Sequence, residues 1–142
     1  MGDWNKEWIK KKNMSAKILS KTNNKCAYCG KCLNEDDHWH IDHIVPKSQG
    51  GSNNIENYFA SCSICNIRKN FRTPDEFKIM LIEQLQKKIE DASFQYLLYI
   101  YQYLGKEDRE ELNNAYLDLL MHIQNANIKF YYESIGALDG KG

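Results

Sequence analysis

The sequence contains no long apolar run. No window holds the roughly eighteen consecutive apolar residues that a membrane-spanning helix needs. No apolar stretch follows the lysines at positions 10 to 12, so the N-terminus does not have the pattern of a secretory signal. We therefore expect no transmembrane segment and a cytoplasmic location.

The sequence also lacks a net charge, because 19 basic residues balance 19 acidic ones. Their distribution is uneven: residues 1–72 carry twelve Lys/Arg and seven Asp/Glu, whereas residues 73–142 carry seven and twelve. The first segment, at +5, is suited to meet a polyanion, while the second, at −5, is a poor phosphate-binding surface. Two ordinary solvated surfaces would give the same charge balance.

Cysteine is scarce, with five residues, but four of them form two Cys-x-x-Cys pairs, Cys26 with Cys29 and Cys62 with Cys65. Without a secretory signal, such pairs favour metal ligation over disulfides. Four thiolates fill the tetrahedral shell of Zn²⁺ and leave no open position, so we expect a structural zinc that does no chemistry. Cys32 is left over, either as a bystander thiol or as a third ligand beside Cys26 and Cys29.

The spacing of apolar residues predicts a mostly helical chain with two short strands. Thr73-Pro74-Asp75-Glu76 marks a helix start, with Thr73 as N-cap and Glu76 closing a capping box. Residues 127–138 carry no pattern that we can assign. The expected elements are a helix over 4–20, a strand over 39–45, a flexible loop over 50–54, a second strand or irregular segment over 55–60, and helices from residue 63 and over 74–90, 92–104 and 106–125.

The segment 92–104 is unusually rich in aromatic residues. So wide an apolar surface is buried either between helices of the same chain or against a partner, which would be another protein or a second copy of this chain. The aromatic residues are Phe94, Tyr96, Tyr99, Tyr101 and Tyr103.

Residues with the chemistry of a hydrolase lie between the cysteine pairs, in His40-Ile41-Asp42-His43-Ile44-Val45-Pro46. Phosphodiester hydrolysis needs a base of near-neutral pKa to activate water, and a divalent cation to neutralise the phosphate and the leaving oxygen. His43 suits the first role and Asp42 the second. Alone, an Asp-His pair is more often a surface or structural feature.

Several motifs follow one another along the chain: Cys26-x-x-Cys29-Gly30, His40 to Pro46, Gly50-Gly51-Ser52, Asn57, and Cys62-x-x-Cys65-Asn66-x-x-Lys69. Together they closely resemble the HNH endonuclease family and its ββα-metal fold over about residues 23–76. The resemblance implies that His43 is the general base, that Asp42 binds the catalytic metal, and that Asn57 braces the loop and helps to orient the base. Asn66 stands where the family often has histidine, as in an HNN variant whose amide oxygen suits Mg²⁺ or Mn²⁺.

Other residues near this segment are candidates for supporting roles. His40 lies two residues before Asp42 on the same strand face, where it either contacts the metal or a phosphate or merely packs. The candidate phosphate contacts are Lys47, Arg68, Lys69 and Arg72.

The expected fold class is α+β, mostly α. A zinc-stabilised ββα-metal core with an N-terminal helix would occupy residues 1–72, and a helical extension for packing or partner binding would occupy residues 73–142. The expected function is hydrolysis of DNA by a metal-dependent HNH endonuclease, with Zn²⁺ as structural metal and Mg²⁺ or Mn²⁺ as catalytic metal. The alternative is a non-catalytic zinc-binding module for nucleic acid or protein.

Overall fold

Two antiparallel strands organise the first part of the chain. In the computed structural model, which describes residues 3–34 and 37–138, β1 (Trp39–His43) pairs with β2 (Tyr58–Cys62). The register sets Trp39 opposite Cys62 and His43 opposite Tyr58. The strand expected over 39–45 is therefore two residues shorter, and the segment expected over 55–60 begins as a 3-10 turn, Ile55–Asn57, before β2.

The connection between the strands has local structure before the loop expected over 50–54. It contains a 3-10 turn, Lys47–Gln49, which ends at Gly50 with a φ of 84°. A Cβ atom on Gly51 would lie 1.7 Å from the carbonyl oxygen of Val45, so only glycine fits where the loop approaches the end of β1.

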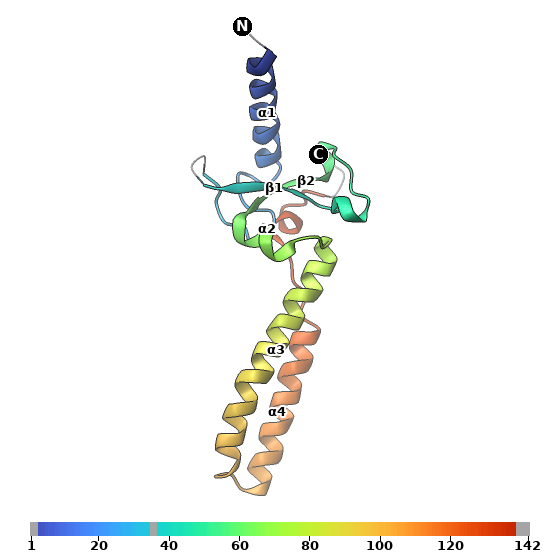
Figure 1. Ribbon diagram of the computed structural model, residues 1–142. Helices are drawn as coiled ribbons and strands as arrows, with labels where there is room; N and C mark the ends of the chain where they lie inside the picture. Colours follow the sequence, from blue (N-terminus) through green and yellow to red (C-terminus); the bar gives the residue numbers. More distant parts are fainter. Residues whose placement is uncertain (1–2, 35–36, 139–142) are drawn as a thin grey trace. The chain divides into compact units, whose positions relative to one another are not determined.

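A short helix, α2 (Ser63–Lys69), follows β2 directly and packs on both strands. Its N-cap is Cys62, whose sulfur accepts a hydrogen bond from the backbone N–H of Cys65. The helix expected from residue 63 is confirmed, and with the strands it forms a small α+β core (Figure 1).

The N-terminal helix α1 (Asp3–Ser20) contacts β2, and Ile18 in its last turn is completely buried. The chain then turns through Asn23 and Asn24, both with positive φ, into the first cysteine pair. Most described side chains of α1 before its last turn are exposed to solvent. The helix is therefore anchored at its C-terminal end.

The last described residues return to this core, which the sequence did not indicate. The backbone N–H groups of Tyr131 and Tyr132 donate to the carbonyl oxygens of Tyr28 and Ala27, at 3.0 and 2.8 Å, beside the short helix α5 (Tyr131–Ser134). The buried ring of Phe130 stacks on Phe77 at 5.2 Å and meets Tyr28 edge-on at 5.1 Å. The first compact unit thus combines residues up to Phe77 with the segment from Lys129.

The second compact unit, Lys78–Ile128, is helical. It contains most of α3 (Pro74–Tyr101) and all of α4 (Lys106–Gln124), and Arg109 and Asn113 of α4 contact the ring and hydroxyl of Tyr101. The expected break near residue 91 is wrong, because no glycine or proline interrupts α3 after its first residue. The division into domains after residue 72 stays a prediction.

The capping box at the start of α3 is confirmed. The backbone N–H of Thr73 donates to the Glu76 carboxylate at 2.8 Å, and the backbone N–H of Glu76 donates to Thr73 Oγ1 at 3.3 Å. Of the aromatic residues at 92–104, Phe94 and Tyr96 lie outside the described side chains, whereas Tyr99 and Tyr103 are exposed. Within the described residues, no helix combines the length and apolar character needed to cross a membrane.

Candidate functional site

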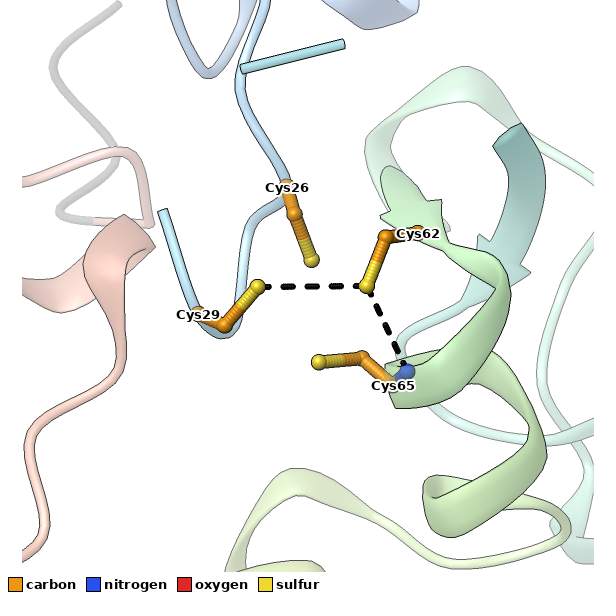
Figure 2. Close-up of side chains that lie close together, drawn as sticks. All are labelled: Cys26, Cys29, Cys62 and Cys65. Atoms are coloured by element: carbon orange, nitrogen blue, oxygen red, sulfur yellow. Dashed lines mark hydrogen bonds between the residues drawn. The ribbon is translucent and has the colours of Figure 1, made fainter. Parts of the chain in front are cut away.

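Four cysteine side chains converge where the first turn meets the end of β2 (Figure 2). The sulfur atoms of Cys26, Cys29, Cys62 and Cys65 all lie within 4.8 Å of one another, and those of Cys29 and Cys62 are 3.8 Å apart. Zn–S bonds of about 2.3 Å in a tetrahedron place the sulfurs about 3.8 Å apart. The geometry therefore fits a structural zinc ion, and Cys32 is not part of the group.

Hydrogen bonds define the backbone and the protonation of the thiols around this site. Gly30 adopts a φ of 73° and donates its N–H to the carbonyl oxygen of Cys26, which closes the first knuckle. The Cys65 thiol and nearby backbone N–H groups donate hydrogen bonds that lower the pKa of Cys26 to about 4, while the bond to Cys26 raises the pKa of Cys65. The thiolate is the form of cysteine that binds metal.

Asp42 lies in β1 with its side chain buried, at 6% exposure, and both carboxylate oxygens engaged. Tyr28 donates its hydroxyl to Oδ2 at 2.5 Å, and Lys69 Nζ lies 3.0 Å from Oδ2 and 3.3 Å from Oδ1. Burial, followed by the neighbouring carboxylate, raises the pKa of Tyr28, so its hydroxyl stays protonated and donates. Desolvation raises the pKa of Asp42, opposed by the hydrogen bond from Tyr28 and the charge of Lys69.

Lys69 is completely buried, with 0% exposure, and also donates to the carbonyl oxygen of His43 at 2.8 Å. The prediction that Lys69 binds a phosphate does not fit this position, because its ammonium group is buried and contacts Asp42 and the carbonyl oxygen of His43. Its place on the face of α2 that turns toward β1 explains the difference. Lys69 instead ties the two neighbouring residues Asp42 and His43 to α2.

His43 ends β1 with a half-buried side chain. Its Nε2 atom lies 3.1 Å from Asn53 Oδ1, and its ring meets the ring of Tyr58 edge-on at 4.8 Å. Tyr58 is the residue opposite His43 in the strand register. The sheet and the following loop therefore fix the orientation of the imidazole from two sides.

Asn57 joins the two ends of the loop that follows β1. Its amide nitrogen donates to the carbonyl oxygens of Val45 and Ser52, at 3.0 and 2.9 Å, and its amide oxygen accepts from the N–H of Val45 at 2.9 Å. These bonds hold the backbone two residues after His43. The side chain of Asn57 can thus brace the loop without facing a substrate.

A cleft of about 230 Å³ opens between β1 and α2. It brings together Asp42, His43 and Lys47 from the strand side and Asn66 from the helix, with Asn70 and Phe71 at its end. A carboxylate, an imidazole and an amide therefore share one concave surface, although their spacing in the chain is as long as 24 residues. Carboxylate and amide oxygens are hard donors of the kind that Mg²⁺ and Mn²⁺ prefer.

The remaining candidates lie outside this cleft. His40 Nε2 is 3.2 Å from Ser63 Oγ at the start of α2, and its side chain is exposed. Arg68 is exposed and Arg72 half-buried, with Arg72 Nη1 3.5 Å from the carbonyl oxygen of Arg68. Both arginines are accessible to a ligand, as is Lys47.

Two contacts at the site were not anticipated from the sequence. Tyr28 lies inside the first Cys-x-x-Cys pair, which brings its hydroxyl to Asp42, and Asn53 follows the two loop glycines and reaches His43. Tyr28 occupies a variable position of its motif, and Asn53 lies just after the Gly50-Gly51-Ser52 motif, so neither is a defining motif residue. Only the folding of the zinc knuckle and the loop onto β1 makes these contacts.

A family model described as HNH endonuclease matches residues 26–72, which include both cysteine pairs, Asp42, His43, Asn57 and Asn66. A comparison with curated proteins gives no match. The matched residues do not extend to α1 or to the helical second unit. Residues 26–72 of this chain therefore match the HNH endonuclease family model and contain a four-cysteine site whose geometry fits structural zinc.

Proposed function

We propose that the domain hydrolyses phosphodiester bonds in DNA, with His43 as general base and with Asp42 and Asn66 as ligands of Mg²⁺ or Mn²⁺. The observation that carries this proposal is the cleft that these three side chains line together. If the chemistry follows the family resemblance, the products carry 5′-phosphate and 3′-hydroxyl ends.

The hydrogen bond of His43 indicates which of its nitrogens acts as base. The Asn53 amide oxygen can only accept, so Nε2 carries the proton and donates to it. Nδ1 is then unprotonated and able to take a proton from water. Asn57 keeps the following backbone in place, so the imidazole does not have to be reoriented during the reaction.

The donor set of the cleft fits a hard cation. The Oδ1 atom of Asp42 accepts a hydrogen bond from Lys69 at 3.3 Å, the longer of the two contacts that Lys69 makes with this carboxylate, and a carboxylate oxygen has two lone pairs. A divalent cation bound there would neutralise charge on the phosphate and the leaving oxygen. Lys69 offsets part of the carboxylate charge, so we expect the cation to bind weakly without substrate phosphate.

The same ion pair favours one alternative, a zinc module that binds nucleic acid or protein without cutting. In that case Asp42 would serve only as the buried partner of Lys69. Cleavage separates the two functions, since a module that only binds never converts plasmid DNA to nicked or linear forms.

Supercoiled plasmid, incubated with the zinc-loaded full chain, tests the proposal. We expect nicked and linear products with Mg²⁺ or Mn²⁺ and none when no divalent cation is added. His43→Ala should slow nicking about 100-fold or more, because general-base catalysis contributes that much. Zinc content should not change in this variant.

His122→Ala is the matched control, because His122 is an exposed histidine of α4 in the second unit. It should nick at the rate of the unaltered chain. Full activity of pure His43→Ala in Mg²⁺ would contradict the proposal, as would the absence of nicking with both cations.

A further inference from the structure

Over residues 6–14, the described side chains of α1 lack the packing that normally stabilises a helix. All side chains from Lys6 to Met14 are exposed, although a helix of this length is marginal in water without tertiary contacts. The helix has five lysines against two acidic residues. Its surface is thus suited to a negatively charged ligand rather than to the interior of this chain.

One face of α1 borders a cleft of about 500 Å³ that is separate from the proposed catalytic cleft. Residues 8, 11, 12, 15 and 19 recur at helical spacing along this face, and Trp39 at the start of β1 completes the lining. The lining residues that matter here are Trp8, Lys11, Lys12, Leu19 and Trp39.

Trp8 is 60% exposed, which is unusual for so large an apolar side chain unless it contacts a ligand. Lys12 Nζ lies 5.2 Å from the centre of its ring, so cation and ring face the same space. Aromatic rings beside lysines are the combination that binds single-stranded nucleic acid, since the rings stack on bases and the lysines meet phosphates.

Strand β1 connects this cleft to His43. Trp39, Ile41 and His43 occupy alternate positions of the strand and therefore share one face. Trp39 and His43 are four steps apart along the strand, a distance of about 13 Å. A strand of nucleic acid with a phosphate beside His43 can reach Trp39 within a few nucleotides.

We propose that the cleft between α1 and β1 binds an unpaired nucleotide of the substrate strand, with its base stacked on Trp8 or Trp39 and neighbouring phosphates at Lys11 and Lys12. The inference rests on the proposed hydrolysis of DNA and adds to it that the bound strand is single-stranded beside the cut. Paired bases stack on one another and offer no free face to a tryptophan, so a duplex would use the lysines alone.

Binding can be measured without cleavage. A fluorescently labelled oligothymidine is titrated with the zinc-loaded His43→Ala chain, without added Mg²⁺ or Mn²⁺, and its anisotropy is recorded. We expect Trp8→Ala to weaken binding about tenfold, as loss of one stacked base does. Trp8→Phe, which keeps a flat ring, should recover part of the affinity.

The double variant Lys11→Ala/Lys12→Ala should weaken binding and reduce the slope of log affinity against log salt by about 1.4, the value for two phosphates of a single strand. Its matched control is Lys87→Ala/Lys88→Ala, which removes two adjacent exposed lysines from α3. The control should bind like its parent chain.

Three results would overturn the inference: unchanged affinity in Trp8→Ala, equal Trp8-dependence with a fully paired duplex, or Trp8-dependent binding to anionic phospholipid vesicles and not to the oligonucleotide. Failure here can be told apart from failure of the catalytic proposal. If the chain nicks plasmid but its binding does not depend on Trp8, only the proposed role of the cleft fails. If binding depends on Trp8 but no nicking occurs, only the proposed catalysis fails.

Discussion

At the scale of single residues, the ion pair between Lys69 and Asp42 is held in place by burial and by a further hydrogen bond. Both side chains are buried, and Tyr28 supplies a further hydrogen bond to the carboxylate. A buried pair of this kind contributes little net stability compared with apolar residues, but losing one partner leaves an unbalanced charge in the core. The consequence can be measured separately from activity.

Lys69→Met should lower the free energy of unfolding by about 3–5 kcal/mol, because Asp42 would remain buried without its counter-charge. Urea denaturation of the zinc-loaded chain measures this loss. Lys69→Met combined with Asp42→Asn should lose less, since no unpaired charge remains. Lys31→Met removes an exposed lysine and should change the stability by less than about 0.5 kcal/mol. Equal effects of Lys69→Met and Lys31→Met would show that the pair is unimportant.

Among the elements, the short helix α2 carries several roles because of its spacing. Cys62 at the N-cap and Cys65 face the thiol group, while Asn66 and Lys69 face β1. These four residues stand at positions i, i+3, i+4 and i+7, a spacing that places them on one face of a helix. This spacing does not distinguish the buried Lys69 from the accessible Asn66, because the burial of Lys69 depends on its pairing with Asp42, 27 residues away.

The start of α3 provides a test at the same scale. Thr73→Ala should reduce the free energy of unfolding by about 1 kcal/mol, since the hydroxyl caps the N–H of Glu76. Thr73→Ser keeps the hydroxyl and should restore most of the loss. Hydrogen bonds from Gln49 and then from the Thr73 backbone lower the pKa of Glu76, so its stabilising effect is present above the unfolded pKa and disappears as the pH falls through the lowered value. Thermal unfolding of Thr73→Ala and Thr73→Ser at neutral pH measures the capping effect. Equal stability of the two variants would contradict the role of the hydroxyl.

Across the whole molecule, local patterns predicted the site better than the core that supports it. The cysteine pairs, the Asp-His pair and the strand-to-helix junction near residue 63 all depend on residues close in sequence. The aromatic core does not, because Phe130 reaches Tyr28 across a hundred residues and comes from a segment without periodicity. The contact of Tyr28 with Asp42 likewise joins the knuckle to β1, 14 residues further along the chain.

The four thiols hold together parts of the chain that are distant in sequence, and substitution of one exposed cysteine tests their role. Cys29→Ser should abolish tight zinc binding and unfold the first unit, since the knuckle and the strand-to-helix junction would lose the metal that joins them. Cys32→Ser is the matched control, because Cys32 is an equally exposed thiol three residues later that lies outside the group. Metal analysis should find one zinc per chain for Cys32→Ser, and near-ultraviolet circular dichroism should retain the signal of the packed aromatic rings. If Cys32→Ser loses its zinc and Cys29→Ser keeps it, Cys32 is the ligand in solution. Since Asp42 and His43 are positioned by β1 next to this junction, Cys29→Ser should also lose plasmid nicking, although it does not alter the identity of any proposed catalytic residue.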